Sequence, residues 1–167
     1  MLTAISPTAR AASAANNAHE VLAKLIAEFP EDKAAYQSTP AENHLLWHVG
    51  HMIVTYHWFA AGLDGQPVGV GEQDNTLFGM GSKPNPDARA YPSLASLRTR
   101  FDAAWKRFST AAHALRDEDA GKPATIESNG YLKDRLDVVE KCAWHDGWHA
   151  GQVSTLRKSL GLKPMWG

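Results

Sequence analysis

The segment LDGQPVGVGEQDNTLFGMGSKPNPDARAYP, residues 63–92, decides the fold expected for this chain of 167 residues. It is rich in glycine and proline, and stretches with helical periodicity precede and follow it. A connection of about thirty residues is uncommon inside a compact domain, where it usually carries function or crosses from one end of a bundle to the other. Such a crossing lets the helices on either side of it run parallel. The segment therefore predicts a four-helix bundle with one long crossover between its second and third helices.

Four stretches carry apolar residues at three- and four-residue steps, and none alternates as a β-strand would. The predicted helices cover approximately residues 7–29, 39–62, 93–116 and 134–161. No repeat, low-complexity tract or change of composition divides the chain. The sequence thus predicts an all-α protein in which residues 1–167 form a single domain.

The second predicted helix has the most explicit start signal. Thr39 is a good N-cap, Pro40 suits the first helical position, and Glu42 completes a capping box. At the other end of the chain, Gly161 is a natural C-cap for the last helix, with Pro164 beyond it.

Composition limits the classes of partner. Hydrophobic residues make up 44% and charged residues 21% of the chain, which is typical of a globular protein. A formal net charge of -1 argues against a nucleic-acid partner, and no apolar stretch is long enough to predict a membrane span. The N-terminus lacks the pattern of a signal peptide, and the single Cys142 suits a reducing compartment. We therefore expect a cytoplasmic protein.

Histidines supply the candidate functional residues. His145 and His149 lie four residues apart in Trp144-His145-Asp146-Gly147-Trp148-His149, so their imidazoles leave the same face of the last helix. A stripe on the second helix carries three more, His44, His48 and His51. Facing helices in a bundle can build a metal site from such side chains. Spacing alone leaves open whether these histidines bind a metal, because a chain with eight histidines also places such a pair by chance.

Two motifs make the chain resemble a known family. The motifs are LLWHVGHMIVTYHWF, residues 45–59, and CAWHDGWHAGQ, residues 142–152. They resemble the DinB/YfiT-like superfamily of metal-dependent proteins, which implies a four-helix bundle with an up-down-down-up arrangement. The resemblance also implies that one histidine of the second helix and a His-x-x-x-His pair of the last helix bind the metal.

Matched residue by residue, the implied metal ligands fall on His51, His145 and His149. His48 is the main alternative to His51 because it lies one turn earlier on the same stripe; its other role would be to orient a ligand. His44 and His57 are interpreted as surface or packing residues.

Other residues close to His145 and His149 each allow two interpretations. Cys142 is either a fourth ligand or, as we expect, a small buried apolar residue. Asp146 occupies the place of the catalytic glutamate of zinc peptidases, but it is shorter and Gly147 weakens the helix, so we expect no peptidase. Gln152 either contacts a bound water or substrate or closes the pocket floor.

A stripe of small residues lies beside the metal face of the last helix. It serves either packing within the bundle or a homodimer interface, and the family resemblance allows the second. Its members are Ala143, Gly147, Ala150, Gly151 and Ser154.

Three imidazoles would leave the double charge of a metal ion uncompensated, which acidifies bound water or a bound thiol. Imidazole donors suit Zn or Ni, which we expect first, and also Fe or Cu. The resemblance implies a metal-dependent enzyme that activates a small thiol or water for transfer or isomerisation, with a small-molecule substrate. Arg135, Lys141 and Arg157 on the last helix either anchor an anionic group of the substrate or, as we expect, are solvated surface charges.

The alternative is a non-catalytic metal-binding or stress-associated protein. A fourth protein ligand would favour this structural or sensing role, whereas an open coordination position would favour the enzyme.

Overall fold

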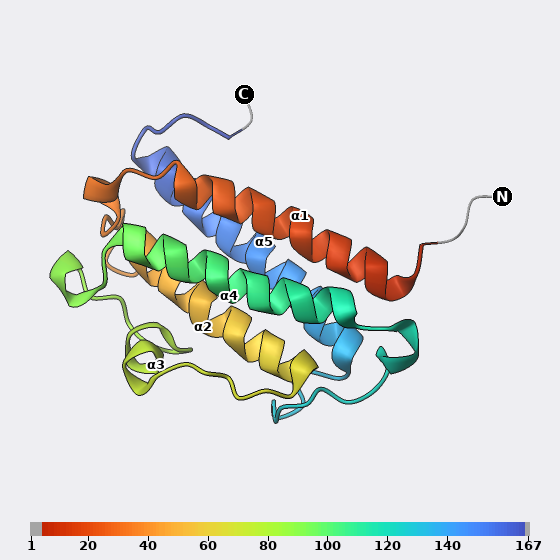
Figure 1. The fold of residues 1–167 in the computed structure, drawn as a ribbon. Helices are drawn as coiled ribbons and strands as arrows, with labels where there is room; N and C mark the ends of the chain where they lie inside the picture. The colour runs from red at the N-terminus through yellow and green to blue at the C-terminus, as the bar shows by residue number, and fades with distance from the viewer. Residues whose placement is uncertain (1–4, 166–167) are drawn as a thin grey trace.

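Four long helices form the body of the protein in the computed structural model, which describes residues 5–165 (Figure 1). They are α1 (Pro7–Ala27), α2 (Leu45–Asp64), α4 (Leu94–Ala114) and α5 (Arg135–Ser159), and a short helix α3 (Glu72–Phe78) lies in the crossover. Single 3-10 turns occupy Glu31–Lys33, Ala88–Ala90 and Asp117–Asp119.

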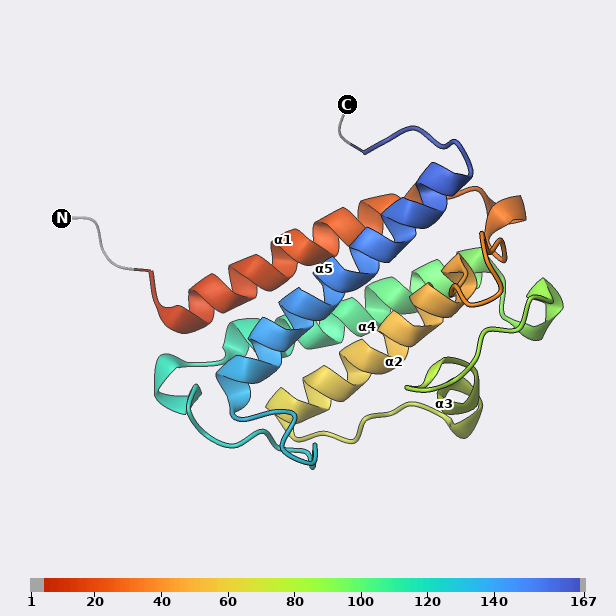
Figure 2. The same cartoon turned by 180° about the vertical axis from the view of Figure 1, so that it is seen from behind.

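The helix directions confirm the up-down-down-up bundle. Helices α1 and α5 run one way, and α2 and α4 run the other, in both views of the molecule (Figures 1 and 2). Helix α1 packs on α5 and α4, and α2 packs on α4 and α5. The parallel pair α2 and α4 is joined by the crossover, as the glycine- and proline-rich segment predicts.

Side-chain caps fix most helix starts near their predicted positions. Ser6, Ser93 and Asp134 accept hydrogen bonds from the first turns of α1, α4 and α5. Each cap satisfies a backbone N–H that has no partner within its helix.

The predicted start of the second helix at Thr39 is wrong. Helix α2 begins at Leu45, and its N-cap is His44, whose Nδ1 accepts from the backbone N–H of Trp47 at 3.1 Å. The Glu42 carboxylate does accept a backbone N–H, but from Ser38, at 2.9 Å, inside a turn. The capping pattern therefore stabilises the loop before α2 instead of the first turn of the helix.

The crossover lies along the outer side of α2 (Figure 2). Phe78, the last residue of α3, attaches it there. Phe78 is 1% exposed and its ring lies on the backbone of α2 at Gly50. A Cβ on Gly50 would lie closer than 3.0 Å to three carbons of that ring, so only glycine permits this contact.

The core between the four helices is apolar and aromatic. Its largest fully buried side chains come from all of them: Leu22, Tyr56, Phe59, Phe101, Phe108 and Leu156. Among residues 5–165, none of the helices combines the length and apolar content that spanning a bilayer requires. The cytoplasmic location stays a prediction.

Candidate metal centre

Three histidines from two helices meet between α2 and α5. Nε2 of His145 lies 3.3 Å from Nε2 of His51 and 3.3 Å from Nε2 of His149. One nitrogen of each ring lies within 4.8 Å of the others. The four-residue spacing on α5 supplies two of these rings on one face, and packing against α2 supplies the third. These are the three residues on which the sequence motifs place the ligands.

Neighbouring groups hold two of the rings by their other nitrogen. His51 Nδ1 donates to the backbone carbonyl of Phe78 at 2.8 Å, and the indole of Trp47 stacks on the ring at 4.6 Å. His149 Nδ1 lies 3.0 Å from Nδ1 of His48. With a proton on Nδ1, the Nε2 lone pair of each ring is free to face the centre.

Burial keeps the centre uncharged. Desolvation lowers the pKa of His145 to about 3 and of His149 to about 2, and it also lowers the pKa of His51. The proximity of the rings to one another adds to the lowering for His145 and His149. All three are therefore neutral at pH 7, which is the form of imidazole that binds a metal ion.

The spacing of the nitrogens fits a single ion. Ligand nitrogens roughly 2.0–2.1 Å from a tetrahedral ion lie about 3.3 Å from each other. The two distances from His145 Nε2 have this value, and the nitrogens of His51 and His149 lie within 4.8 Å of each other. The donor set and its geometry could thus hold one divalent metal with three neutral ligands.

The remaining histidines of α2 have different surroundings. His48 is 1% exposed and contacts the ring of His149, which is the orienting role considered for it from sequence. His44 is fully buried, so the surface reading of it is wrong; it caps α2 and its Nε2 lies 3.0 Å from the carbonyl of Asn85. His57 is half-buried beside Arg107.

Cys142 and Asp146 lie outside the histidine cluster. Cys142 is fully buried in the apolar core, where burial raises the pKa of its thiol well above 9.0. Asp146 is also fully buried and accepts a hydrogen bond from the Tyr56 hydroxyl at 2.8 Å. Neither belongs to the group that could hold a metal.

A buried polar chain beneath the centre was not anticipated from sequence. His19 Nδ1 lies 2.9 Å from the Tyr56 hydroxyl, which in turn reaches Asp146, and the His19 ring stacks on Trp105 at 3.8 Å. Burial raises the pKa of Asp146 and lowers the pKa of His19 to about 4. The sequence did contain a signal that His19 is buried, because His19 lies at helical spacing between the buried residues Ala15 and Leu22.

An apolar cavity of about 540 Å³ opens beside His51 and His145. We call it the side cavity. The α2 side of its wall comes from Val54, Trp58 and Phe59, and the crossover adds Val68 and Met80. Tyr131, from the loop before α5, forms part of the opposite side, with its ring 6.1 Å from that of Trp58.

Three basic residues of α5, Arg135, Lys141 and Arg157, form contacts within the protein. Arg157 is 5% exposed and donates to the carbonyls of Leu25 and Lys163, so its expected place at the surface is wrong. Lys141 pairs with Asp137 at 2.8 Å and lies over the ring of Tyr131. Arg135 donates to the carbonyl of Pro123 at 3.4 Å.

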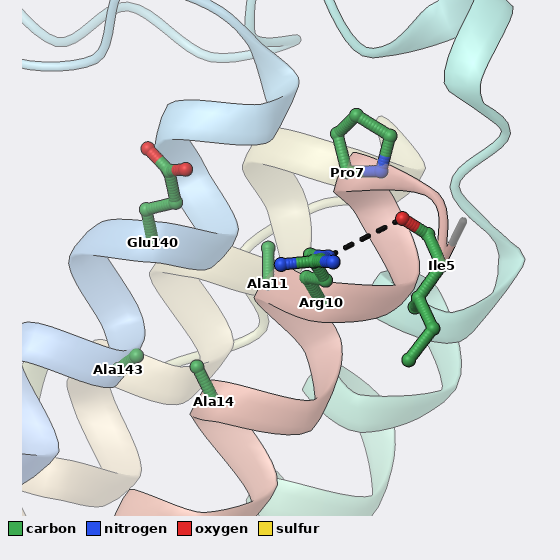
Figure 3. A pocket seen from close by; sticks show the side chains of 7 residues that line it. All are labelled: Ile5, Pro7, Arg10, Ala11, Ala14, Glu140 and Ala143. Atoms are coloured by element: carbon green, nitrogen blue, oxygen red, sulfur yellow. Dashed lines mark hydrogen bonds between the residues drawn. The ribbon is translucent and has the colours of Figure 1, made fainter. Parts of the chain in front are cut away.

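A second hollow, of about 550 Å³, lies between α1 and α5 (Figure 3). Short side chains such as Ala11, Ala14 and Ala143 line it, and Arg10 donates from Nε to the carbonyl of Ile5 at 3.3 Å. No group of histidine, cysteine or carboxylate side chains suited to a metal lies there among the residues described.

The comparisons with known proteins agree with the fold and with the motifs. A solved structure of a conserved protein from Enterococcus faecalis is similar, with a TM-score of 0.68 at 15% sequence identity, over 95% of this chain and 99% of the other. The comparison with curated proteins finds no match. The family model of the DinB superfamily matches residues 14–153, which include both histidine motifs. This chain is therefore a member of the DinB superfamily.

Proposed function

We propose that the protein binds one divalent transition metal through His51, His145 and His149 and is a metal-dependent enzyme that acts on a small molecule. The observation that carries the proposal is the convergence of three neutral Nε2 atoms at the spacing of a metal site. Two of the rings are held at Nδ1 by groups that do not compete for the ion. Zinc or nickel is the first expectation, and iron or copper also suits imidazole donors.

The surroundings favour an enzyme over a structural metal site. The group that could hold a metal contains three side chains, and within residues 5–165 no fourth His, Cys or carboxylate joins them. A structural zinc normally has four protein ligands, whereas a catalytic one keeps a position open. The side cavity also brings a space for a substrate next to two of the three ligands.

The metal, when bound, supplies Lewis acidity that ionises a coordinated thiol or water near neutral pH. The chain's own contributions are the positions of the three imidazoles and the exclusion of water by the buried rings around them. His48 holds the proton of His149 at Nδ1, and the Phe78 carbonyl holds the proton of His51 at Nδ1. We further propose that the molecule activated by the metal is a low-molecular-weight thiol, because the family resemblance implies a thiol-dependent enzyme.

The test is the metal content of the purified protein and of two variants. His149→Ala should lose stoichiometric metal by elemental analysis and keep its helical circular dichroism. His113→Ala, which alters an exposed histidine of α4, is the matched control and should keep both. Unchanged metal content in His149→Ala would refute the site, and metal without turnover in a screen of several thiols would favour the non-catalytic alternative.

We also propose that a second copy of the chain packs on the outer face of α5. Trp144 and Trp148 are each 57% exposed there, with ring centroids 5.6 Å apart. A Cβ added to Gly147 or Gly151 would meet nothing within 4 Å, so the space beside these glycines is open. Exposed apolar side chains of this size are a feature of interfaces between subunits.

A further inference from the structure

The walls of the side cavity are apolar and partly aromatic. Trp58, Phe59 and Tyr131 give it three rings, and Val54, Val68 and Met80 complete the apolar surface. Its volume of about 540 Å³ lies in the range of sites that enclose a small organic molecule, roughly 300–1,000 Å³. The imidazoles of His51 and His145 border the same space.

The polar side chains in the wall have few free hydrogen-bonding groups. The Thr55 hydroxyl donates to the backbone carbonyl of His51 at 2.8 Å, and the Ser128 hydroxyl accepts from the N–H of Leu132 at 3.0 Å. Asn75 also borders the cavity, on the crossover. A molecule inside the cavity thus finds few polar partners apart from the metal centre itself.

Among the residues that the structure describes, no charged side chain lines the side cavity. The lining holds no Asp, Glu, Lys or Arg. The charged groups on the same elements pair with each other: Lys141 with Asp137 at 2.8 Å, and Arg107 with Asp64 at 3.2 Å. Away from the metal centre, burying a charged group here would cost its hydration without a compensating partner in the wall.

We propose that the side cavity binds an uncharged, aromatic reactant and presents its polar end to the metal centre. This inference rests on the proposed function for the metal centre, and it adds the class of molecule that the centre acts upon. A thiol with charged groups would then reach the metal with its sulfur alone, its charged body remaining outside the side cavity. The ring surfaces of Trp58 and Tyr131 favour a flat aromatic group through stacking and edge contacts.

Two naphthalenes of nearly equal shape test the class of ligand. Methyl 2-naphthyl sulfone is neutral, whereas naphthalene-2-sulfonate is an anion. Equilibrium dialysis against the purified protein, read by naphthalene absorbance, gives both affinities. The dialysis uses protein freed of metal by a chelator, because an ion held by three neutral imidazoles would keep its double charge and attract the sulfonate. We expect the sulfone to bind at least about tenfold more tightly, because the cavity wall then offers the anion no cationic partner.

A matched pair of variants locates the binding. Val68 lines the side cavity, and Val70, two residues later in the crossover, lines a separate smaller hollow. Val68→Phe should weaken binding of the sulfone at least about fivefold, and Val70→Phe should leave it within about twofold. Equal affinity for the two naphthalenes, or equal effects of the two variants, would overturn the inference.

Metal content is measured on the same preparations before the chelator is added. Protein without stoichiometric metal would refute the proposed function, and the ratio of the two affinities would still decide the character of the cavity. Full metal content with preference for the anion would overturn the cavity assignment alone.

Discussion

The contact between Gly50 and Phe78 provides the sharpest test of how the crossover serves the metal centre. The substitution Gly50→Ala adds one Cβ that would lie closer than 3.0 Å to three carbons of the Phe78 ring. These carbons belong to a rigid ring buried to 1% exposure, so the ring cannot turn aside and must leave its position. The Phe78 carbonyl, 2.8 Å from His51 Nδ1, would leave with it.

The expected cost has two parts. Losing the burial of a phenylalanine ring costs about 3–5 kcal/mol, and the better helix propensity of alanine returns about 1 kcal/mol. The free energy of unfolding of Gly50→Ala should therefore fall by about 2–4 kcal/mol. Without the carbonyl that fixes the ring of His51, metal affinity should fall about 10–100-fold.

Urea unfolding measures the first quantity, and competition with a chromophoric chelator measures the second. Gly62→Ala is the matched control: it lies on the same helix, and its Cβ would meet nothing closer than 3.4 Å. That variant should keep its metal affinity and be no less stable. The double variant Gly50→Ala, Phe78→Ala removes the clash and keeps the helix propensity of alanine, so it should be about 1 kcal/mol more stable than Phe78→Ala alone. Metal affinity of Gly50→Ala within about twofold of the natural protein would refute the reasoning.

Three further predictions concern other contacts. His48→Leu removes the partner of His149 Nδ1, so metal affinity should fall about 10–100-fold by chelator competition, while an unchanged affinity would show that His48 does not position the ligand. Burial lowers the pKa of His19 to about 4, below its value near 6.5 in the unfolded chain, so stability should be lost as pH falls from 6.5 towards 4, by about 3 kcal/mol. His19→Phe keeps the stacking on Trp105 and should remove that part of the loss in urea unfolding at pH 7 and pH 4.5; an unchanged acid loss would contradict it. Trp148→Glu should convert a dimer to a monomer in analytical ultracentrifugation, and the same mass for both proteins would refute the interface on α5.

Sequence patterns predicted the fold well because its determinants are local. Helical periodicity and the glycine- and proline-rich segment at residues 63–92 are enough to place four helices and the crossover. The predicted start of α2 was wrong for a physical reason. A capping box is recognised by residue types alone, and the same types at residues 38–42 stabilise a turn, while His44 supplies the cap with an imidazole nitrogen.

The candidate metal centre was predictable only in part. Two residues at four-residue spacing identify His145 and His149, because a helix must place them on one face. Spacing cannot choose between His48 and His51, which lie on the same stripe one turn apart. The difference between them is tertiary: the crossover carbonyl of Phe78 holds the ring of His51, and His48 instead contacts His149.

The crossover therefore contributes to the site through its main chain and its side chains in separate ways. Its main-chain carbonyl orients His51, and the position of that carbonyl depends on the ring of Phe78 beside Gly50. Its side chains Val68 and Met80 shape the cavity next to the centre. Substitutions at these two positions can alter the cavity without moving an imidazole, since the triad stands on α2 and α5. Ligand selectivity and metal affinity should accordingly respond to different residues of one segment.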